Sequence, residues 1–479
     1  MEISSVMFYL LASIVIGFYL AGFIAIVHVI MNGRTAQGTV GWTIALLELP
    51  YIALPLYLII GSHRFWGYVK ARRSGNTELH HIVNDLILYS KGRDLTCDAP
   101  DSFKNVIRSL TKLPLTQGNH AQLLIDGEKT FQAMFESIDA ANDYILIQFF
   151  IIRDDYLGRQ LKDKLIAKAQ TGVRVYFLYD EIGCFNLPNH YLRELKQAGI
   201  DVTGFKTTRG WVHPLRINFR NHRKIIIVDG YTAFAGGFNV GDEYMGKSSR
   251  FGHWRDTHLK LQGPSVHILQ LTFCEDWYWA THTVPTLHWE PGKLTHSDQR
   301  VLPISSGPAD QMETCTLFFV HAINAAKTRL WIVSPYFVPD EQVMTALQLA
   351  ALRGVDVRIL LPAKPDHLLV YLSSWSYYEQ AEQAGVKIYR YQTGFLHQKV
   401  MLIDNDYATV GTANFDNRSF RINFEMTVLV INKEFCKEVE VMLEEDFSHS
   451  SLVCADEYAC KPFWYKLAVR SARLLSPLQ

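Results

Sequence analysis

The chain carries the octapeptide HRKIIIVD at residues 222–229 and a second octapeptide, HQKVMLID, at residues 397–404. In both, a His is followed by a Lys two positions later and by an Asp five positions after the Lys. Six residues separate each Asp from a turn of small residues that ends in Asn, GGFN at 236–239 and GTAN at 411–414. Two copies with the same downstream turn at the same offset indicate a duplicated unit rather than a chance match.

The apolar run between each Lys and Asp predicts a short buried β-strand. Because side chains two apart in a strand point to the same face, the His and Lys of each copy project together. The Asp opens a turn, and a second strand then brings the Asn back toward the His and Lys. The expected catalytic residues are His222, Lys224, Asp229, His397, Lys399 and Asp404, and the expected phosphate-binding amides are Asn239 and Asn414.

An imidazole, a cation and an amide in each copy suit a phosphodiester. Lys and Asn can hold the non-bridging oxygens and stabilise the charge that grows in the transition state. A neutral His can attack phosphorus and a charged His can donate a proton, but one imidazole cannot do both at once. The alternative, two structural histidines in the core, is disfavoured because burying a His–Lys pair twice costs free energy. The sequence therefore predicts two halves of one phosphodiester-handling site.

Two carboxylates begin the strands that follow the Asn turns. Glu425 opens the run EMTVLV, and Asp256 opens the run DTHLKL after a longer insertion. We expect Asp256 and Glu425 to hydrogen-bond the motif histidines, which would select one tautomer and raise the basicity of the ring. The alternative is that they are ordinary strand-end acids in salt bridges.

The two halves also match outside the motifs. IDAA at 138–141 parallels INAA at 323–326, and GVRV at 172–175 parallels GVDV at 354–357. Helical patterns closed by Gly and followed by short strands predict βαβ units, hence an α/β fold with the active site at the interface of two similar domains. The expected organisation is a membrane hairpin at 1–61, a juxtamembrane linker at 62–118, a first half at 119–295 and a second half at 300–479, joined through 283–312.

Composition limits the classes of partner. The 47 basic and 47 acidic residues leave a net charge of zero, so no global basic field for nucleic acid is present. The seven cysteines lack C-x-x-C spacing, which favours reduced thiols and supports no metal site.

The first 61 residues differ in kind from the rest. Ile3 to Met31 contains no charged side chain and is long enough to span a bilayer, and Val40 to Gly61 is expected to span again, interrupted by Glu48. No basic n-region or A-x-A-like site indicates a cleaved signal peptide. The loop between the spans holds only Arg34, whereas several basic residues follow the second span. The positive-inside rule then places the catalytic halves in the cytoplasm.

The other end of the chain offers a second membrane hint. Pro462 can open a helix in which Lys466, Arg470 and Arg473 fall on one side. The residues nearer the other side are Trp464, Leu467, Ser471, Leu474 and Leu475. Such a basic amphipathic helix can lie on an anionic bilayer or pack onto the catalytic domain, and the pattern does not choose between them.

With these motifs placed, the chain resembles the phospholipase D superfamily and, within it, the bacterial cardiolipin synthases with two membrane spans. The doubled H-x-K-x4-D motif carries the superfamily resemblance. The subfamily resemblance rests on the spans and on blocks such as WRDTH at 254–258, SPYFVPD at 334–340 and NFDNRS at 414–419. It runs essentially from end to end. One departure is Gly237, which stands where the second half has the hydroxyl residue Thr412 and implies unequal roles for the two motifs.

The resemblance implies a two-step phosphatidyl transfer in the bacterial inner membrane that requires no cofactor or metal. His222 would attack the phosphorus of one phosphatidylglycerol to give a phosphohistidine, while His397 protonates the departing glycerol. His397 would then deprotonate a hydroxyl of a second phosphatidylglycerol, giving cardiolipin. The chain by itself leaves open which His is the nucleophile, whether phosphatidylethanolamine replaces one lipid, and the oligomeric state.

Three other functions fit parts of this pattern. A hydrolytic phospholipase D would use the same residues with water as acceptor, and the membrane spans favour transfer over hydrolysis. A nuclease of the same superfamily is disfavoured by the neutral charge, and a non-enzymatic membrane scaffold by the two complete motifs.

Overall fold

A computed structural model describes residues 2–33, 35–61, 68, 101–205, 219–290 and 298–479. The chain separates into two compact units, one of residues 1–67 with 207–219 and one of residues 68–206 with 220–479. The basic residues used to orient the membrane hairpin lie outside the described part, namely Arg34, Arg64, Lys70, Arg72 and Arg73. Cys97, one of the seven cysteines, also lies outside it.

The described residues of the first unit form three apolar helices: α1 (Glu2–Asn32), α2 (Ala36–Glu48) and α3 (Pro50–Ile60). Among the described residues, α1 is long and apolar enough to cross a membrane. The second expected span, Val40–Gly61, is not one continuous helix. It breaks at Leu49, whose φ of −136° and ψ of 58° are not helical, because Pro50 lacks the N–H that would continue α2 and instead opens α3.

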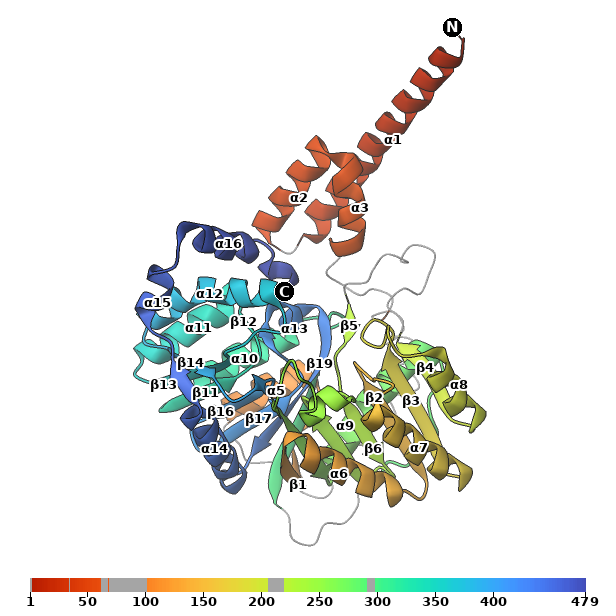
Figure 1. Cartoon of the computed structure of the whole chain (residues 1–479), viewed down its shortest axis with the longest axis vertical. Coiled ribbons are helices and arrows are strands. Elements are labelled where there is room, and N and C mark those ends of the chain that lie inside the picture. The colour runs from red at the N-terminus through yellow and green to blue at the C-terminus, as the bar shows by residue number, and fades with distance from the viewer. Residues whose placement is uncertain (1, 34, 62–67, 69–100, 206–218, 291–297) are drawn as a thin grey trace. The chain divides into compact units, whose positions relative to one another are not determined.

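The second unit is built on one long mixed sheet (Figure 1). Its two halves show the same strand order outward from the antiparallel pair β1 and β10 at the centre. On the first-half side the order is β1 (Thr116–Ile125), β9 (Thr257–Gln262), β7 (Thr232–Gly236), β6 (Ile225–Val228), β2 (Tyr144–Phe149), β3 (Arg174–Asp180) and β4 (Asp201–Phe205). On the second-half side it is β10 (Gln299–Ser306), β19 (Asn423–Ile431), β17 (Tyr407–Gly411), β16 (Val400–Ile403), β11 (Arg329–Val333), β13 (Asp356–Pro362), β14 (Lys387–Tyr391) and β20 (Ser450–Leu452). The predicted internal duplication is thus present in the strand order.

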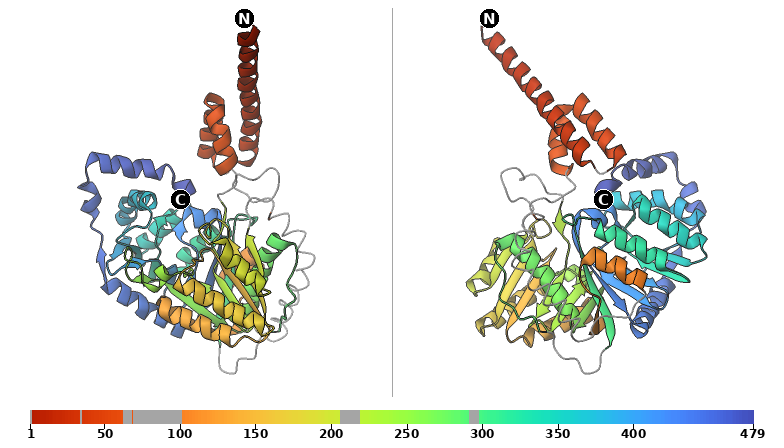
Figure 2. Two further views of the ribbon diagram at one scale, coloured as in Figure 1. Left: turned by 45° about the vertical axis from the view of Figure 1, so that its right-hand side comes forward. Right: turned by 180° about the vertical axis from the view of Figure 1, so that it is seen from behind.

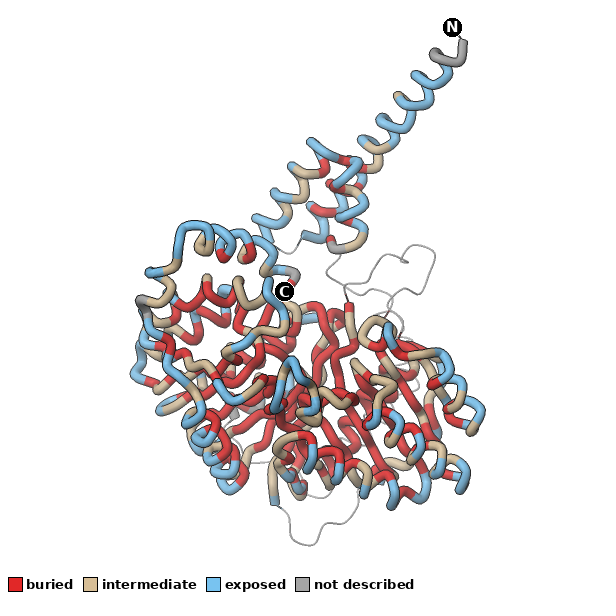
Figure 3. Tube along the Cα trace, viewed as in Figure 1, coloured by how far each residue is buried: buried red, intermediate tan, exposed pale blue. Residues whose placement is uncertain are grey.

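Helices cover this sheet. In the first half they are α6 (Asp126–Asp139), α7 (Tyr156–Gln170), α8 (Asn189–Gln197) and α9 (Ser265–Thr281). In the second half they are α10 (Thr314–Ala325), α11 (Glu341–Leu352), α12 (Leu368–Gln383), α13 (Asn417–Arg421), α14 (Lys433–Ser448), α15 (Ala455–Ala459) and α16 (Phe463–Arg473), and short 3-10 turns lie at η1 (Asp242–Met245) and η2 (Ser476–Leu478). Figure 3 shows the strands as mostly buried, whereas the helices expose their outer surfaces.

The expected linker at 62–118 needs correction in its described part. Helix α5 (Asp101–Thr111) lies beside α10, as the rear view in Figure 2 shows. Its Phe103 and Ile107 are buried in the hydrophobic core of the second half, and the Phe103 ring lies 4.7 Å from that of Tyr407. The apolar residues Phe103, Val106, Ile107 and Leu110 recur at helical spacing and give α5 one buried face, so the segment is part of the second unit. Likewise, β10 begins at Gln299, inside the expected 283–312 connection.

Candidate active site

Two parallel strand pairings bring the two motifs together. Before His222, β5 (Arg220–Asn221) pairs in parallel with the start of β19, so that Arg220 and Asn423 are register partners. Before His397, β15 (Phe395–Leu396) pairs in parallel with β8 (Trp254–Arg255). Each pairing therefore joins the segment before one half's His to the segment before the other half's carboxylate.

The pairings continue through the histidine backbone. His222 N–H donates to the Phe424 carbonyl at 2.9 Å, and His397 N–H donates to the Arg255 carbonyl at 2.8 Å. Phe424 and Arg255 are the residues directly before Glu425 and Asp256. This backbone bond sets each imidazole against a carboxylate from the opposite half.

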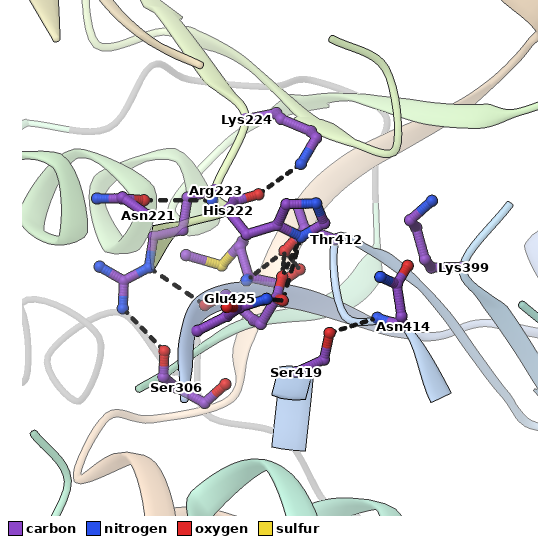
Figure 4. Close-up of polar contacts among 12 residues, drawn as sticks. Asn221, His222, Arg223, Lys224, Ser306, Lys399, Thr412, Asn414, Ser419 and Glu425 are labelled. Atoms are coloured by element: carbon purple, nitrogen blue, oxygen red, sulfur yellow. Dashed lines mark hydrogen bonds and ion pairs between the residues drawn. The ribbon is translucent and has the colours of Figure 1, made fainter. Parts of the chain in front are cut away.

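The resulting side-chain pairs are crossed between the halves. His222 Nδ1 lies 2.9 Å from Glu425 Oε2, and His397 Nδ1 lies 2.7 Å from Asp256 Oδ2 (Figure 4 shows the first pair). Both carboxylates are fully buried. Since an ionised carboxylate only accepts hydrogen bonds, His222 Nδ1 carries the proton and His222 Nε2 keeps its lone pair. His397 Nδ1 faces two groups, because Lys399 Nζ lies 2.8 Å from it, and its bond to Asp256 is made when Nδ1 carries the proton. The expected carboxylate–histidine contacts are present, with partners that local sequence proximity would not have paired.

The motif lysines lie in the same buried region. Lys224 Nζ donates to the His222 carbonyl at 2.6 Å, and Lys399 Nζ donates to the His397 carbonyl. Lys399 Nζ also lies 4.0 Å from the Asp256 carboxylate. The charge of Lys399 acts on Lys224 and His222 of the other half, so the two motifs form one electrostatic unit.

Burial shifts the pKa values of these groups. It lowers the pKa of His222 to about 4, against the opposing pull of Glu425, and it lowers the pKa of His397 as well. Burial also lowers the pKa of Lys224 to about 7 and that of Lys399 to about 8. Both histidines are therefore neutral at neutral pH in the free protein, and the lysines titrate far below their usual range.

The carboxylates respond in the opposite direction. Burial alone would raise the pKa of Asp256, but Lys399 and His397 outweigh burial and hold it below its usual value. His222 and Lys224 do the same for Glu425. Both acids are thus ionised and available as acceptors for the histidines.

The turn after each motif explains the difference between Gly237 and Thr412. A Cβ at Gly237 would lie 2.0 Å from Asp256 Oδ1, so a side chain there would collide with the carboxylate. The equivalent Thr412 instead donates its hydroxyl to Glu425 Oε2 at 2.5 Å (Figure 4). The two halves therefore hold their carboxylates differently: one by close packing and the other by a hydroxyl.

The two turn amides are placed by their own hydrogen bonds. Asn239 Oδ1 accepts the Ile151 N–H at 3.1 Å, and its Nδ2 lies 3.4 Å from the Tyr244 hydroxyl. Asn414 N–H donates to Ser419 Oγ at 3.1 Å at the start of α13. Asn414 Oδ1 is buried without a hydrogen-bond partner among the described residues. An oriented but incompletely bonded amide suits contact with a ligand.

Asp229 and Asp404 do not lie with the rest of the site. Asp229 accepts the backbone N–H groups of residues 142–144, and Asp404 accepts those of residues 327–329. Each closes the loop before a neighbouring strand, at the end of β6 or β16 remote from the histidine. This geometry gives the two aspartates a structural role and does not support the catalytic role expected from the motif.

Comparison with known proteins identifies the family of the chain. The family model described as "Cardiolipin synthase, PLD-like domain" matches residues 134–249 and 319–447. Cardiolipin synthase A of Pseudomonas aeruginosa is 46% identical over 471 residues, which is 98% of this chain and 96% of that protein. Cardiolipin synthase A of Pseudomonas fluorescens is 47% identical over 462 residues, covering 95% and 96%. The chain belongs to the cardiolipin synthase family of the phospholipase D superfamily.

Solved structures show the same fold in more distant proteins. Phosphatidylserine synthase of Haemophilus influenzae aligns with a TM-score of 0.58 at 14% identity, covering 79% of this chain and all of that one. Polyphosphate kinase of Porphyromonas gingivalis aligns with a TM-score of 0.50 at 13% identity, covering 79% and 54%. At these identities the likeness concerns the fold alone.

The structure adds a pair of buried acids that the motif analysis missed. Arg223 Nη1 donates to both carboxylate oxygens of Asp276 in α9 at 2.7 and 2.8 Å, and Gln398 Nε2 donates to Asp446 of α14 at 2.9 Å. Arg223 and Gln398 each follow a motif His. The Glu-Asp pairs at 275–276 and 445–446, in equivalent helices, were a sequence signal that could have identified them.

The lowered pKa values predict the pH profile of this family member. As pH falls toward about 4, His222 gains a proton and can no longer attack phosphorus. As pH rises through about 7 and then about 8, Lys224 and Lys399 lose their charge. The profile of kcat/KM for phosphatidylglycerol should be a bell with these limbs. In Lys224→Arg, where the cation stays charged, any residual activity should extend to higher pH; an unmoved alkaline limb would count against this assignment.

Thr412 offers a test of the hydroxyl that holds Glu425. Thr412→Val keeps the shape and deletes a hydrogen bond to a charged group, which is worth about 1.5–3 kcal/mol. We expect kcat to fall about tenfold or more and the acid limb of the pH profile to shift, whereas Thr412→Ser should retain most activity. Equal losses in both variants would show that packing, and not the hydroxyl, is what matters at this position.

Proposed function

We propose that the chain transfers a phosphatidyl group from one phosphatidylglycerol to another, forming cardiolipin and glycerol. The observation that carries the proposal is the crossed pair of His–carboxylate contacts, with both motif lysines, in one buried site of a member of the cardiolipin synthase family. Two imidazoles with free Nε2 atoms match a reaction that needs one nucleophile and one proton carrier.

In the first step, His222 Nε2 attacks the phosphorus of the donor lipid. The bond from phosphorus to the glycerol oxygen breaks, and protonated His397 gives its proton to that oxygen. His397 is neutral in the free protein, and the bound phosphodiester anion favours its protonated form. Lys224, Lys399, Asn239 and Asn414 hold the non-bridging oxygens while their charge grows.

In the second step, neutral His397 removes the proton from a primary hydroxyl of the acceptor phosphatidylglycerol. That oxygen attacks the phosphohistidine phosphorus, and the bond from phosphorus to His222 Nε2 breaks. The number of phosphodiester bonds is conserved, so the transfer needs no nucleotide. Asp256 and Glu425 orient the two rings and stabilise each when it is charged.

The test is incubation of membranes containing the chain with isotopically labelled phosphatidylglycerol, with products resolved by mass. Cardiolipin with one equivalent of glycerol is the expected result. Phosphatidic acid as main product would identify a hydrolase. Turnover only after addition of phosphatidylethanolamine would identify a different lipid pair.

We further propose that α1 and the α2–α3 pair form the two legs of a hairpin in the bacterial inner membrane, with the catalytic unit in the cytoplasm. The 11 residues of α3 rise only about 16 Å, so a second crossing would need α2 as well. Cys454 and Cys460 are exposed on the catalytic unit. A membrane-impermeant maleimide should label them only after spheroplasts are lysed. Labelling of intact spheroplasts would reverse the orientation.

A further inference from the structure

Helix α16 exposes a face of large apolar side chains, which we call the α16 apolar face. Its members are Phe463, Trp464 and Leu467 of the helix together with Leu474 and Leu475 of the turn that follows it. Trp464 is 75% exposed and Leu474 is 81% exposed, although large apolar side chains such as these usually lie in a protein core. Single exposed apolar residues are common, but five large ones within one short segment mark an interaction site.

The opposite side of α16 is already packed. Val469 and Ala472 are buried, and the Tyr465 ring meets that of Trp375 of α12 edge to face at 6.0 Å. The Arg473 guanidinium lies over the Tyr377 ring at 4.9 Å. These contacts fix the orientation of α16 on the domain. Because the side with Val469 and Ala472 is packed, the α16 apolar face points outward. The sequence left open whether this helix packs onto the catalytic domain or lies on a bilayer. The packing takes up one side of the helix and leaves the other side exposed.

The basic residues beside the α16 apolar face indicate what kind of partner surface it contacts. Residues 463–479 contain no Asp or Glu, and on a helical projection Lys466 and Arg470 border the apolar stripe. A protein partner would need its own acidic rim, whereas a bilayer with anionic headgroups supplies the apolar layer and the negative charge together. Phe463 and Trp464 also suit the boundary between headgroups and acyl chains.

The segment after α16 leads back to the active site. Gln479 directly follows the turn η2, and its backbone carbonyl accepts the Arg418 N–H at 2.7 Å. Arg418 belongs to α13, and Ser419 of the same helix bonds the backbone of Asn414. A surface contact at α16 is therefore connected through two short elements to a residue expected to bind phosphate.

We propose that the α16 apolar face inserts into the headgroup region of an anionic bilayer and so holds the catalytic unit on the membrane that supplies its lipids. The proposal is separate from the choice of acceptor lipid. It assigns to α16 a contact with the bilayer in addition to any made by the N-terminal helices.

The first test uses the fluorescence of the full chain in vesicles of phosphatidylglycerol and phosphatidylcholine with brominated acyl chains. Bromine quenches only tryptophans within the bilayer, so the parent protein should lose more fluorescence than Trp464→Phe. Removing phosphatidylglycerol from the vesicles should reduce this difference. Equal quenching of parent and variant, with or without the anionic lipid, would overturn the proposal. This readout does not depend on catalytic activity and remains valid if the proposed function fails.

The second test compares substrates. The triple variant Trp464→Ser, Leu467→Ser, Leu474→Ser should lose at least tenfold in kcat/KM on vesicles and keep parental kcat/KM on dispersed short-chain phosphatidylglycerol. A matched control replaces three other exposed apolar residues, Leu349, Leu352 and Val441, and should retain both activities. Equal losses on both substrates, or no loss on vesicles, would contradict bilayer docking. If the triple variant instead turns a parental dimer into a monomer, the face binds a second copy and the proposal fails.

Discussion

Replacing His222 with Asn is expected to reduce transfer by about 10⁴-fold or more, because loss of the nucleophile removes the covalent route. His397→Asn should reduce it by about 10²–10⁴-fold, since proton transfer alone contributes that much. Each histidine is 8% exposed. Replacement of either by a smaller polar side chain should leave the fold intact. Thermal unfolding of both variants should resemble that of the parent protein.

A substrate with a good leaving group separates the two roles. A p-nitrophenyl ester of phosphatidic acid needs no protonation of its leaving group, so the first step can proceed without the general acid. His397→Asn should release a burst of nitrophenol close to one equivalent per site and accumulate a phosphohistidine on residue 222. His222→Asn should give no burst. The reverse pattern would make His397 the nucleophile and His222 the proton carrier.

Replacing Asp276 with Ala is expected to cause the largest loss of stability. Its buried carboxylate accepts hydrogen bonds from Tyr68, Gln148, Asn221 and Arg223 at 2.7–2.8 Å. Arg223 is only 3% exposed, and removing its partner leaves a buried charge uncompensated, which costs about 3–5 kcal/mol. Activity should fall as well, because Asn221 and Arg223 flank His222. Thermal unfolding of the purified protein in detergent measures the effect.

A double variant provides the control for that prediction. Asp276→Leu with Arg223→Met removes both charges and fills similar volume, and such exchanges of buried ion pairs are often neutral for stability. The double variant should therefore unfold at a higher temperature than Asp276→Ala. If it is equally unstable, the loss comes from Tyr68, Gln148 and Asn221 and not from the stranded guanidinium.

The fold class and the duplicated motif could be predicted because they depend on local patterns. The run IIIV between Lys224 and Asp229 forms β6, and VMLI between Lys399 and Asp404 forms β16. The apolar α1 was visible for the same reason. Glu48 and Pro50 marked the break at Leu49 in the sequence, because a proline cannot continue a helix. Pattern alone did not place α5 in the core, because an amphipathic helix does not show which surface it covers.

The aspartates of the motifs show how regular spacing can mislead. Asp229 and Asp404 recur at the same offset as the histidines, and this suggested a shared chemical role. A strand advances about 3.3 Å per residue, so a residue at the far end of β6 or β16 cannot reach the chemistry at the near end. Their conformations, each with a φ of 50°, and their bonds to three successive backbone N–H groups instead explain their constant position.

The sequence by itself named the two histidines, two lysines, two amides and two carboxylates of the site, together with two motif aspartates that the structure places away from it. It could not determine which carboxylate serves which histidine. That choice was made by the parallel pairing of β5 with β19 and of β15 with β8, which crosses from one half to the other. Residue type and spacing act through the local backbone, whereas the partner of a buried charge depends on which distant strands share hydrogen bonds.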